Sequence, residues 1–317
     1  MTPQDVRAFF EAHWTVRQYQ NFQMPPEHLG ALLYAAHRAP TDATAQMYSF
    51  IRLENPELRQ KVAELSGNPH IASSSEAFIV CADLYRLKSL LEHKGYTYGH
   101  WPAASVHFAI GDAVMAGQNL LLAAEMLGYR GCWIGGILSA LAPISDLLEL
   151  PQGVFPFAGL TVGLSAEEPQ SRPRVQPELL FHTNKYHRPS GEELDVALER
   201  MAPITARGDW AQSLARYFAV GGTMEAREVM LRDFLTTQGF SHLHNSSEDN
   251  LDEPNLDKLF ARAESLGYPE TVLRRKGSVV EAWIDEGRTA HRGEGVGATQ
   301  ALTGAIEAAL EAGKLGG

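Results

Sequence analysis

The 317-residue sequence has few cysteines, no excess of positive charge and no long apolar run. Both cysteines, Cys81 and Cys132, lie in apolar stretches, so we expect buried free thiols in a reducing cytoplasm rather than a disulfide framework. The formal net charge of −11 argues against general nucleic-acid binding. No stretch of about 18 apolar residues occurs, which predicts no membrane span. The first residues have neither a basic start nor an apolar core, so no signal peptide is expected.

A glycine fingerprint is also missing after the first predicted strand, Ser49–Leu53, which counts against a Rossmann dinucleotide site. Near the C-terminus, Gly293-x-Gly295-x-x-Ala298 matches the fingerprint formally. Too few residues follow it for the second strand and its acidic partner. The length and a hydrophobic content of 44% instead allow one large domain and a smaller one.

The most informative stretch lies between residues 128 and 174. A short aromatic and apolar run, Arg130–Trp133, predicts a buried strand, and Gly135-Gly136 follows it. Two adjacent glycines carry no Cβ, so a flat ligand can press against bare backbone. Farther along, Arg172-Pro173-Arg174 places two cations on a stiffened backbone. These features suit a planar anionic cofactor, although a glycine pair after a strand is more often a plain turn.

A second polar cluster lies near the N-terminus. His13, Thr15 and Arg17 alternate along the chain, so in an extended segment their side chains share one face. A hydroxyl and a guanidinium on one face suit a phosphate or the polar edge of a ring. Spacing alone favours the alternative, a surface loop with an ordinary arginine.

Helical and strand patterns alternate through the first 240 residues. The predicted helices are Pro3–Trp14, Glu27–Arg38, Pro56–Leu65, Val106–Leu127, Ile144–Leu150, Glu192–Met201, Trp210–Ala219 and Met224–Gln238. The predicted strands are Ser49–Leu53, Ala77–Ala82, Arg130–Trp133 and Phe157–Val162. The longest helix is rich in small residues, which predicts close packing in the core or at a dimer axis.

A set of short motifs follows in order along residues 3–240: HWTVRQY, the loop from Ala39 to Gln46, WIGGI, PFAGLTVG, RPR and HTNKYH. In this order they resemble the flavin-dependent nitroreductase family, most closely its NADPH-dependent nitro and flavin reductases. The resemblance implies an α+β fold with a mixed, mostly antiparallel sheet wrapped by helices. It also implies a cytoplasmic homodimer that binds FMN non-covalently at the interface. NADPH or NADH would be the reductant, and small aromatic oxidants such as nitro compounds or quinones, or free flavin, the substrates.

The resemblance also assigns cofactor-binding positions residue by residue. On the FMN phosphate and neighbouring polar edge it places His13, Trp14, Thr15 and Arg17. Near the flavin ring it places Thr41, Asn68, Trp133, Ile134, Gly135 and Gly136, and across ring and phosphate it places Arg172 and Arg174. Two departures stand out, because Trp14 replaces the usual arginine and Arg172 replaces a lysine. Arg207 resembles a loop arginine that meets the 2′-phosphate of NADPH.

The resemblance implies no protein acid or base, because hydride transfer belongs to the cofactor. We therefore expect no catalytic side chain and no metal ligand, and we expect His182 and His187 to be structural or exposed. Beyond residue 240 we expect an acidic linker, 241–255, and a small α+β accessory domain, 256–317. Its predicted elements are helices 256–266 and 297–312 and a hairpin of Ser278–Asp285 with Arg288–Arg292. This domain leaves an alternative open: a flavin-binding regulatory or storage protein whose C-terminal module binds a partner.

Overall fold

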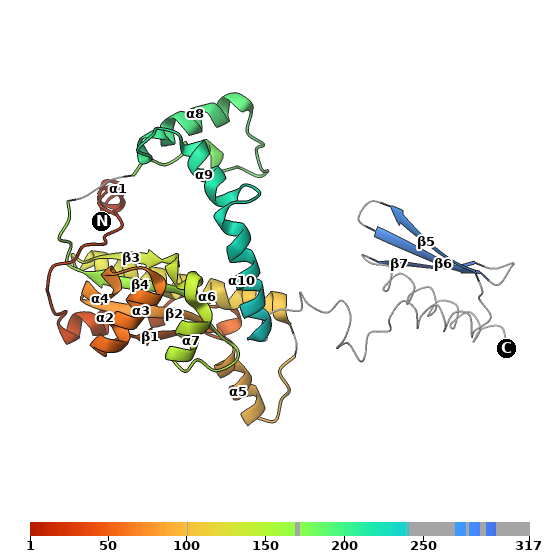
Figure 1. Ribbon diagram of the computed structural model, residues 1–317, viewed down its shortest axis with the longest axis horizontal. Coiled ribbons are helices and arrows are strands. Elements are labelled where there is room, and N and C mark those ends of the chain that lie inside the picture. The colour runs from red at the N-terminus through yellow and green to blue at the C-terminus, as the bar shows by residue number, and fades with distance from the viewer. Residues whose placement is uncertain are drawn as a thin grey trace. The chain divides into compact units, whose positions relative to one another are not determined.

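The computed structural model describes residues 1–99, 101–168, 172–238, 240, 270–276, 279–285 and 290–295. The chain divides into two compact units, Met1–His244 and Asn245–Gly317. A four-stranded sheet surrounded by helices forms the first unit, and a three-stranded sheet lies in the second (Figure 1). The expected α+β fold is therefore confirmed for the first unit.

The elements of the first unit follow the predicted alternation. Its helices are α1 (Pro3–Glu11), α2 (Pro26–His37), α3 (Pro56–Ser66), α4 (His70–Ser73), α5 (Tyr85–His93), α6 (Pro102–Met126), α7 (Leu141–Leu147), α8 (Gly191–Met201), α9 (Trp210–Phe218) and α10 (Thr223–Thr237). Its strands are β1 (Tyr48–Arg52), β2 (Glu76–Asp83), β3 (Arg130–Ile134) and β4 (Val154–Gly163). Single turns of 3-10 helix are η1 (Asp42–Thr44), η3 (Pro177–Leu179) and η4 (Ala202–Ile204), and η2 (Gly135–Ala140) is longer.

The sheet of the first unit has the order β1-β2-β4-β3, and its described pairings are all antiparallel. The whole of β2 is buried, which explains its continuous apolar run instead of an alternating pattern. Strand β3 lies at one edge of the sheet, and the N-terminal segment adds backbone hydrogen bonds beside it. There the amide of Val16 donates to the carbonyl of Gly131 at 3.2 Å, and Tyr19 forms an antiparallel bridge with Ser165.

Helix α6 is the core helix of this unit. By length and composition alone it is long and apolar enough to cross a membrane. In the fold it packs instead against α2 and β2, as its small residues predict. The apolar side chains that it buries include Ala109, Ala113, Ala116, Leu120, Leu121 and Ala124.

Helix α7 differs most from its prediction. It begins at Leu141 and ends at Leu147, so the predicted helix Ile144–Leu150 was wrong in its bounds. The cause is η2, which starts at the glycine pair and runs directly into α7, and Glu149, whose φ of 52° ends the helix early. Helix α1 likewise ends at Glu11, before the predicted end at Trp14.

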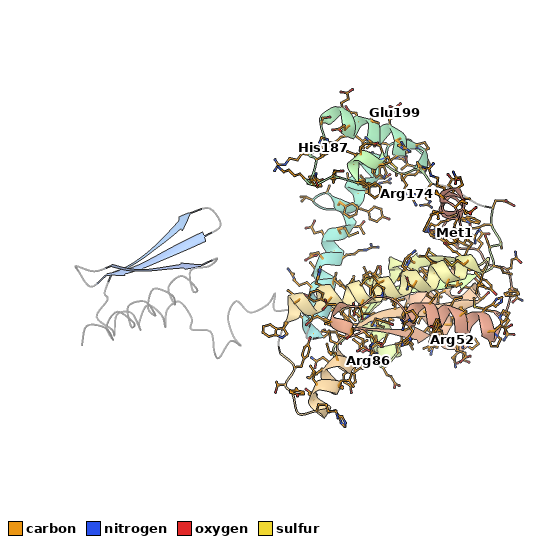
Figure 2. The ribbon with its side chains drawn as sticks, turned by 180° about the vertical axis from the view of Figure 1, so that it is seen from behind. Met1, Arg52, Arg86, Arg174, His187 and Glu199 are labelled. Atoms are coloured by element: carbon orange, nitrogen blue, oxygen red, sulfur yellow. The ribbon has the colours of Figure 1, made fainter. Side chains whose placement is uncertain are left out.

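Helices α8 and α9 lie away from the four-stranded sheet in both views (Figures 1 and 2). We call residues 177–222 the arm. Helix α10 leads back to the sheet, where Phe234 is buried beside Phe155 and Phe240. The ring centroid of Phe155 lies 6.1 Å from that of Phe234 and 6.3 Å from that of Phe240. This aromatic cluster anchors the arm to the body of the unit.

The second unit contains β5 (Glu270–Lys276), β6 (Val279–Asp285) and β7 (Ala290–Gly295) in the order β5-β6-β7. Strands β6 and β7 pair antiparallel, which confirms the predicted hairpin, with β7 ending later than Arg292. Strand β5 was not predicted. The expected linker 241–255 and the helices 256–266 and 297–312 lie outside the described residues.

Candidate functional site

The N-terminal segment that follows α1 is extended and held in place by backbone hydrogen bonds. Val16 is fully buried, whereas Thr15 and Arg17 beside it are exposed, as the alternation predicts. The carboxylate Oε1 of Glu167 accepts hydrogen bonds from the amides of Arg17 and Gln18, at 2.5 and 3.2 Å. The segment therefore presents the Arg17 side chain from an ordered backbone.

His13 and Trp14 are contacted from the end of α6 and the start of β3, respectively. The Nδ1 of His13 lies 2.6 Å from Oε1 of Glu125, near the end of α6. The guanidinium of Arg130, the first residue of β3, lies over the Trp14 ring, with Cζ 4.5 Å from the ring centroid. Sequence reasoning missed both Glu125 and Arg130, because these contacts join distant parts of the chain.

The glycine pair meets Asn68 at the end of β3. A Cβ on Gly136 would lie 2.1 Å from Nδ2 of Asn68 and 2.7 Å from the carbonyl oxygen of Ser66. A Cβ on Gly135 would meet no atom within 4 Å. Gly136 is therefore required for close packing, whereas Gly135 leaves bare backbone facing open space. A flat ring can approach the protein at this point.

Trp133 directs its ring away from this open backbone and toward α6. A Cβ on Gly117, in α6, would lie 2.2 Å from Cη2 of the Trp133 ring, so the ring packs directly against this glycine. Its Nε1 donates a hydrogen bond to Oε1 of Gln118 at 3.2 Å. Ile134 is also buried, at 2% exposure. Residues 133–136 can therefore face a ligand chiefly through their backbone, in the manner that the resemblance implies.

Charged groups from two distant segments converge on β3. Burial raises the pKa of the Cys132 thiol and the charge of Glu167 raises it further, whereas the cations Arg17 and Arg172 partly oppose that rise. Burial lowers the pKa of His70, and the charge of Arg17 lowers it further. The charges of Arg17, Glu167 and Arg172 therefore all act on the same strand.

Arg174 does not join this cluster of cations. Its Nη1 donates to the carbonyl oxygens of Arg172 and Pro173, at 3.2 and 3.1 Å, so the side chain folds back on its own backbone. Figure 2 shows Arg174 toward α8, apart from Arg52 and Arg86 beside the sheet. Arg207 is exposed within the arm, in the connection between α8 and α9. Of these three arginines, the charge of Arg172 alone is seen to act on a group of β3 within the described residues.

The loop after Thr41 is strained and held by a buried acid. Its left-handed residues are Ala43, Thr44 and Gln46, with φ of 45°, 57° and 52°. The fully buried carboxylate of Asp112, on α6, accepts from the amides of Asp42 and Met47, each at 2.9 Å. Such strain is often kept at functional loops. Sequence reasoning missed Asp112, although an acid among apolar residues in the middle of the helix pattern could have marked it.

Of the predicted positions, Trp14 and Asn68 lie against β3 or the glycines after it, and residues 133–136 form the end of β3 and the turn that follows. The part of the chain described here holds no cluster of His, Cys, Asp and Glu suited to a metal. A family model described as "Nitroreductase family" matches residues 11–164. A Cr(VI) reductase from Pseudomonas sp. (strain G-1) is 30% identical over 245 residues, which cover 74% of this chain and 99% of that relative. An FMN reductase (NADPH) from Bacillus subtilis is 33% identical over 178 residues, or 55% of this chain and 72% of that relative.

Comparison with solved structures identifies the same group of proteins. The solved structure of the NfrA1 nitroreductase from Bacillus subtilis superposes with a TM-score of 0.68 at 25% identity, covering 74% of this chain and 98% of that one. The motif order, the antiparallel sheet wrapped by helices and these matches agree, and the chain belongs to the nitroreductase family.

Proposed function

We propose that this chain is an FMN-dependent oxidoreductase that uses NADPH or NADH to reduce nitro compounds, quinones or free flavin. The observation that carries this proposal is the open backbone at Gly135, directly after β3, the strand whose Cys132 thiol feels the charges of Arg17 and Arg172. A flat ring with an anionic tail needs both features. The relative named FMN reductase (NADPH) supports the choice of cofactor and reductant.

The residues around β3 would hold and orient the cofactor. Gly135 and Asn68 would contact the flat ring, and Arg17, with Thr15 and His13 on the same segment, would bind the phosphate. When bound, FMN accepts hydride from the nicotinamide and passes electrons to the oxidant. Arg172 would stabilise negative charge on the reduced ring, since a fixed cation costs no reorganisation there. No protein acid or base is needed.

We also propose that the enzyme is a homodimer in the cytoplasm. Helix α1 buries no residue in the single chain, and Val6 and Phe10 are 42% and 55% exposed. The arm exposes further large apolar side chains, namely Phe181, Tyr186, Tyr217, Phe218 and Val220. Apolar surface of this extent marks a protein interface. A second copy of the chain would cover it and complete the cofactor pocket.

The preferred nucleotide and oxidant are part of the same proposal. Arg207 would bind the 2′-phosphate of NADPH, because its guanidinium is exposed and suited to a charge-assisted contact with that dianion. An open site with few polar contacts beyond the cofactor would accept small aromatic oxidants of several kinds.

Two measurements test this function. Purified protein should contain about one non-covalently bound FMN per chain, which acid release and absorbance spectroscopy determine. One pocket that serves reductant and oxidant in turn predicts ping-pong kinetics, with parallel lines in double-reciprocal plots. Intersecting lines would contradict the single shared pocket. Bound flavin without turnover would favour the alternative, a flavin-binding regulatory or storage protein.

A further inference from the structure

Trp14 stands where the resemblance implies an arginine, and the structure places another arginine against it. The Cζ of Arg130 lies 4.5 Å from the Trp14 ring centroid, within the range of a cation–π contact. The Nη1 of Arg130 donates to the carbonyl oxygen of Tyr129 at 2.7 Å, which fixes the guanidinium against its own strand. The cation missing from position 14 is therefore present next to position 14.

The neighbouring contacts fix this arrangement on both sides. Oε1 of Glu125 lies 2.6 Å from Nδ1 of His13, and its side chain is only 3% exposed. The amide of Val16 donates to the carbonyl of Gly131, the residue after Arg130. The end of α6 and the start of β3 thus hold three successive parts of the N-terminal segment, and Trp14 lies between two hydrogen-bonded residues.

The charge of Arg130 is not neutralised by an ion pair with any residue that the structure describes. The nearest acid of this cluster, Glu125, has one oxygen on His13. Three buried atoms here have no hydrogen-bond partner among the described residues: the donors Nε of Arg130 and Nε1 of Trp14, and the acceptor Oε2 of Glu125. The donors and the guanidinium give the cluster the character of an anion site, and Glu125 limits its net charge.

We propose that Arg130 is a positioning residue of the cofactor site that supplies, through the face of Trp14, the positive charge an arginine at position 14 would supply. Its ligand class is a phosphate monoester, here the phosphate of FMN. This inference rests on the proposed function, since it assumes that the segment from His13 to Arg17 meets that phosphate. Arg130 orders Trp14 and contributes its charge from behind the ring.

Riboflavin separates this role from a general structural one, because it has the flavin ring but no phosphate. We expect Arg130→Ala to weaken FMN binding to the flavin-free protein about tenfold, because it removes a nearby charge and the cation–π contact that orders Trp14. Riboflavin binding should change less than twofold. The matched control is Arg38→Ala, which removes an exposed arginine that follows α2 and should change neither affinity.

The rescue variant decides the question of charge. If Arg130 replaces the cation missing at position 14, Trp14→Arg combined with Arg130→Ala should restore FMN affinity to within about threefold of the wild type. Equal losses of FMN and riboflavin in Arg130→Ala, or no rescue by Trp14→Arg, would overturn the inference while leaving the proposed function intact. A wild-type protein that binds neither flavin would instead overturn the proposed function, and the inference with it.

Discussion

The side-chain amide of Asn68 lies directly against Gly136, so that a Cβ on the glycine would come within 2.1 Å of Nδ2. Asn68 follows α3, and Gly136 follows β3. The resemblance assigned both to the flavin ring separately, and the structure brings them into contact. The amide itself is held by a hydrogen bond from Nδ2 to the carbonyl of Ser66, at 2.5 Å. This contact leaves no room for a side chain at position 136.

Substitution of the two glycines should separate packing from cofactor binding. Gly136→Ala places a methyl group against the Ser66 carbonyl and Asn68, so we expect it to lower the free energy of unfolding by about 1–3 kcal/mol. Gly135→Ala is the matched control, because its Cβ meets no atom within 4 Å. It should leave the stability of the flavin-free protein nearly unchanged. Urea denaturation of both variants, monitored by circular dichroism, tests this difference; equal losses would refute the close contact at Gly136.

Arg17 should bind the cofactor rather than support the fold. Its side chain is exposed, whereas its amide makes the structural contact with Glu167. We therefore expect Arg17→Ala to weaken FMN binding by about 1.5–3 kcal/mol, the range for a lost charged hydrogen bond. The free energy of unfolding without flavin should stay the same. Isothermal titration with FMN measures the first quantity, and an unchanged affinity would remove Arg17 from the site. The control is Arg38→Ala, an exposed arginine that follows α2.

Arg207 should distinguish the two nucleotides. Only NADPH has a 2′-phosphate, so Arg207→Ala should raise the KM for NADPH about three- to tenfold and leave that for NADH nearly unchanged. The effect should shrink as salt rises, because the loop is exposed and salt screens exposed charges. Arg200→Ala, on the neighbouring helix α8, is the control. Equal losses of kcat/KM for both nucleotides would show that Arg207 does not read the phosphate.

His70 predicts a pH dependence of stability. Burial and the charge of Arg17 lower its pKa from the ordinary value of 6.5, so the folded protein favours the neutral imidazole. The unfolded chain therefore binds the proton more readily. It follows that the contribution of His70 is present above pH 6.5 and is lost as the pH falls below it. Between pH 7 and 5, wild-type stability should fall more steeply than that of His70→Gln. His93→Gln, exposed in α5, should retain the wild-type slope; identical slopes in all three proteins would contradict the assignment.

The sequence predicted most elements of the first unit to within a few residues, because each has a local signal. Pro56 and Gly67 bound α3, and the continuous apolar run of β2 identifies a strand buried on both faces. The bounds of α7 were wrong because a 3-10 helix that starts from two glycines has no periodicity of 3.6 residues to mark where the α-helix begins.

The candidate site was predicted by position but not by contact. Motif order identified Arg17 and Arg172, yet nothing in their spacing shows that both charges act on the Cys132 thiol. That convergence needs the antiparallel pairing of β3 with β4, which is a tertiary property. The contacts of Arg130 with Trp14 and of Glu125 with His13 could not be predicted from the sequence for the same reason. They join segments more than 100 residues apart, 112 in the case of His13 and Glu125.

The central claim is that this chain transfers electrons from a nicotinamide nucleotide to a flavin bound around β3. The most direct test is to mix the purified flavin-loaded protein with NADPH under nitrogen in a stopped-flow spectrophotometer. We predict rapid bleaching of the yellow flavin absorbance near 450 nm, of the order of one flavin reduced per chain, and recovery of the colour when a quinone is added. A flavin spectrum that stays unchanged with both NADPH and NADH would contradict the account.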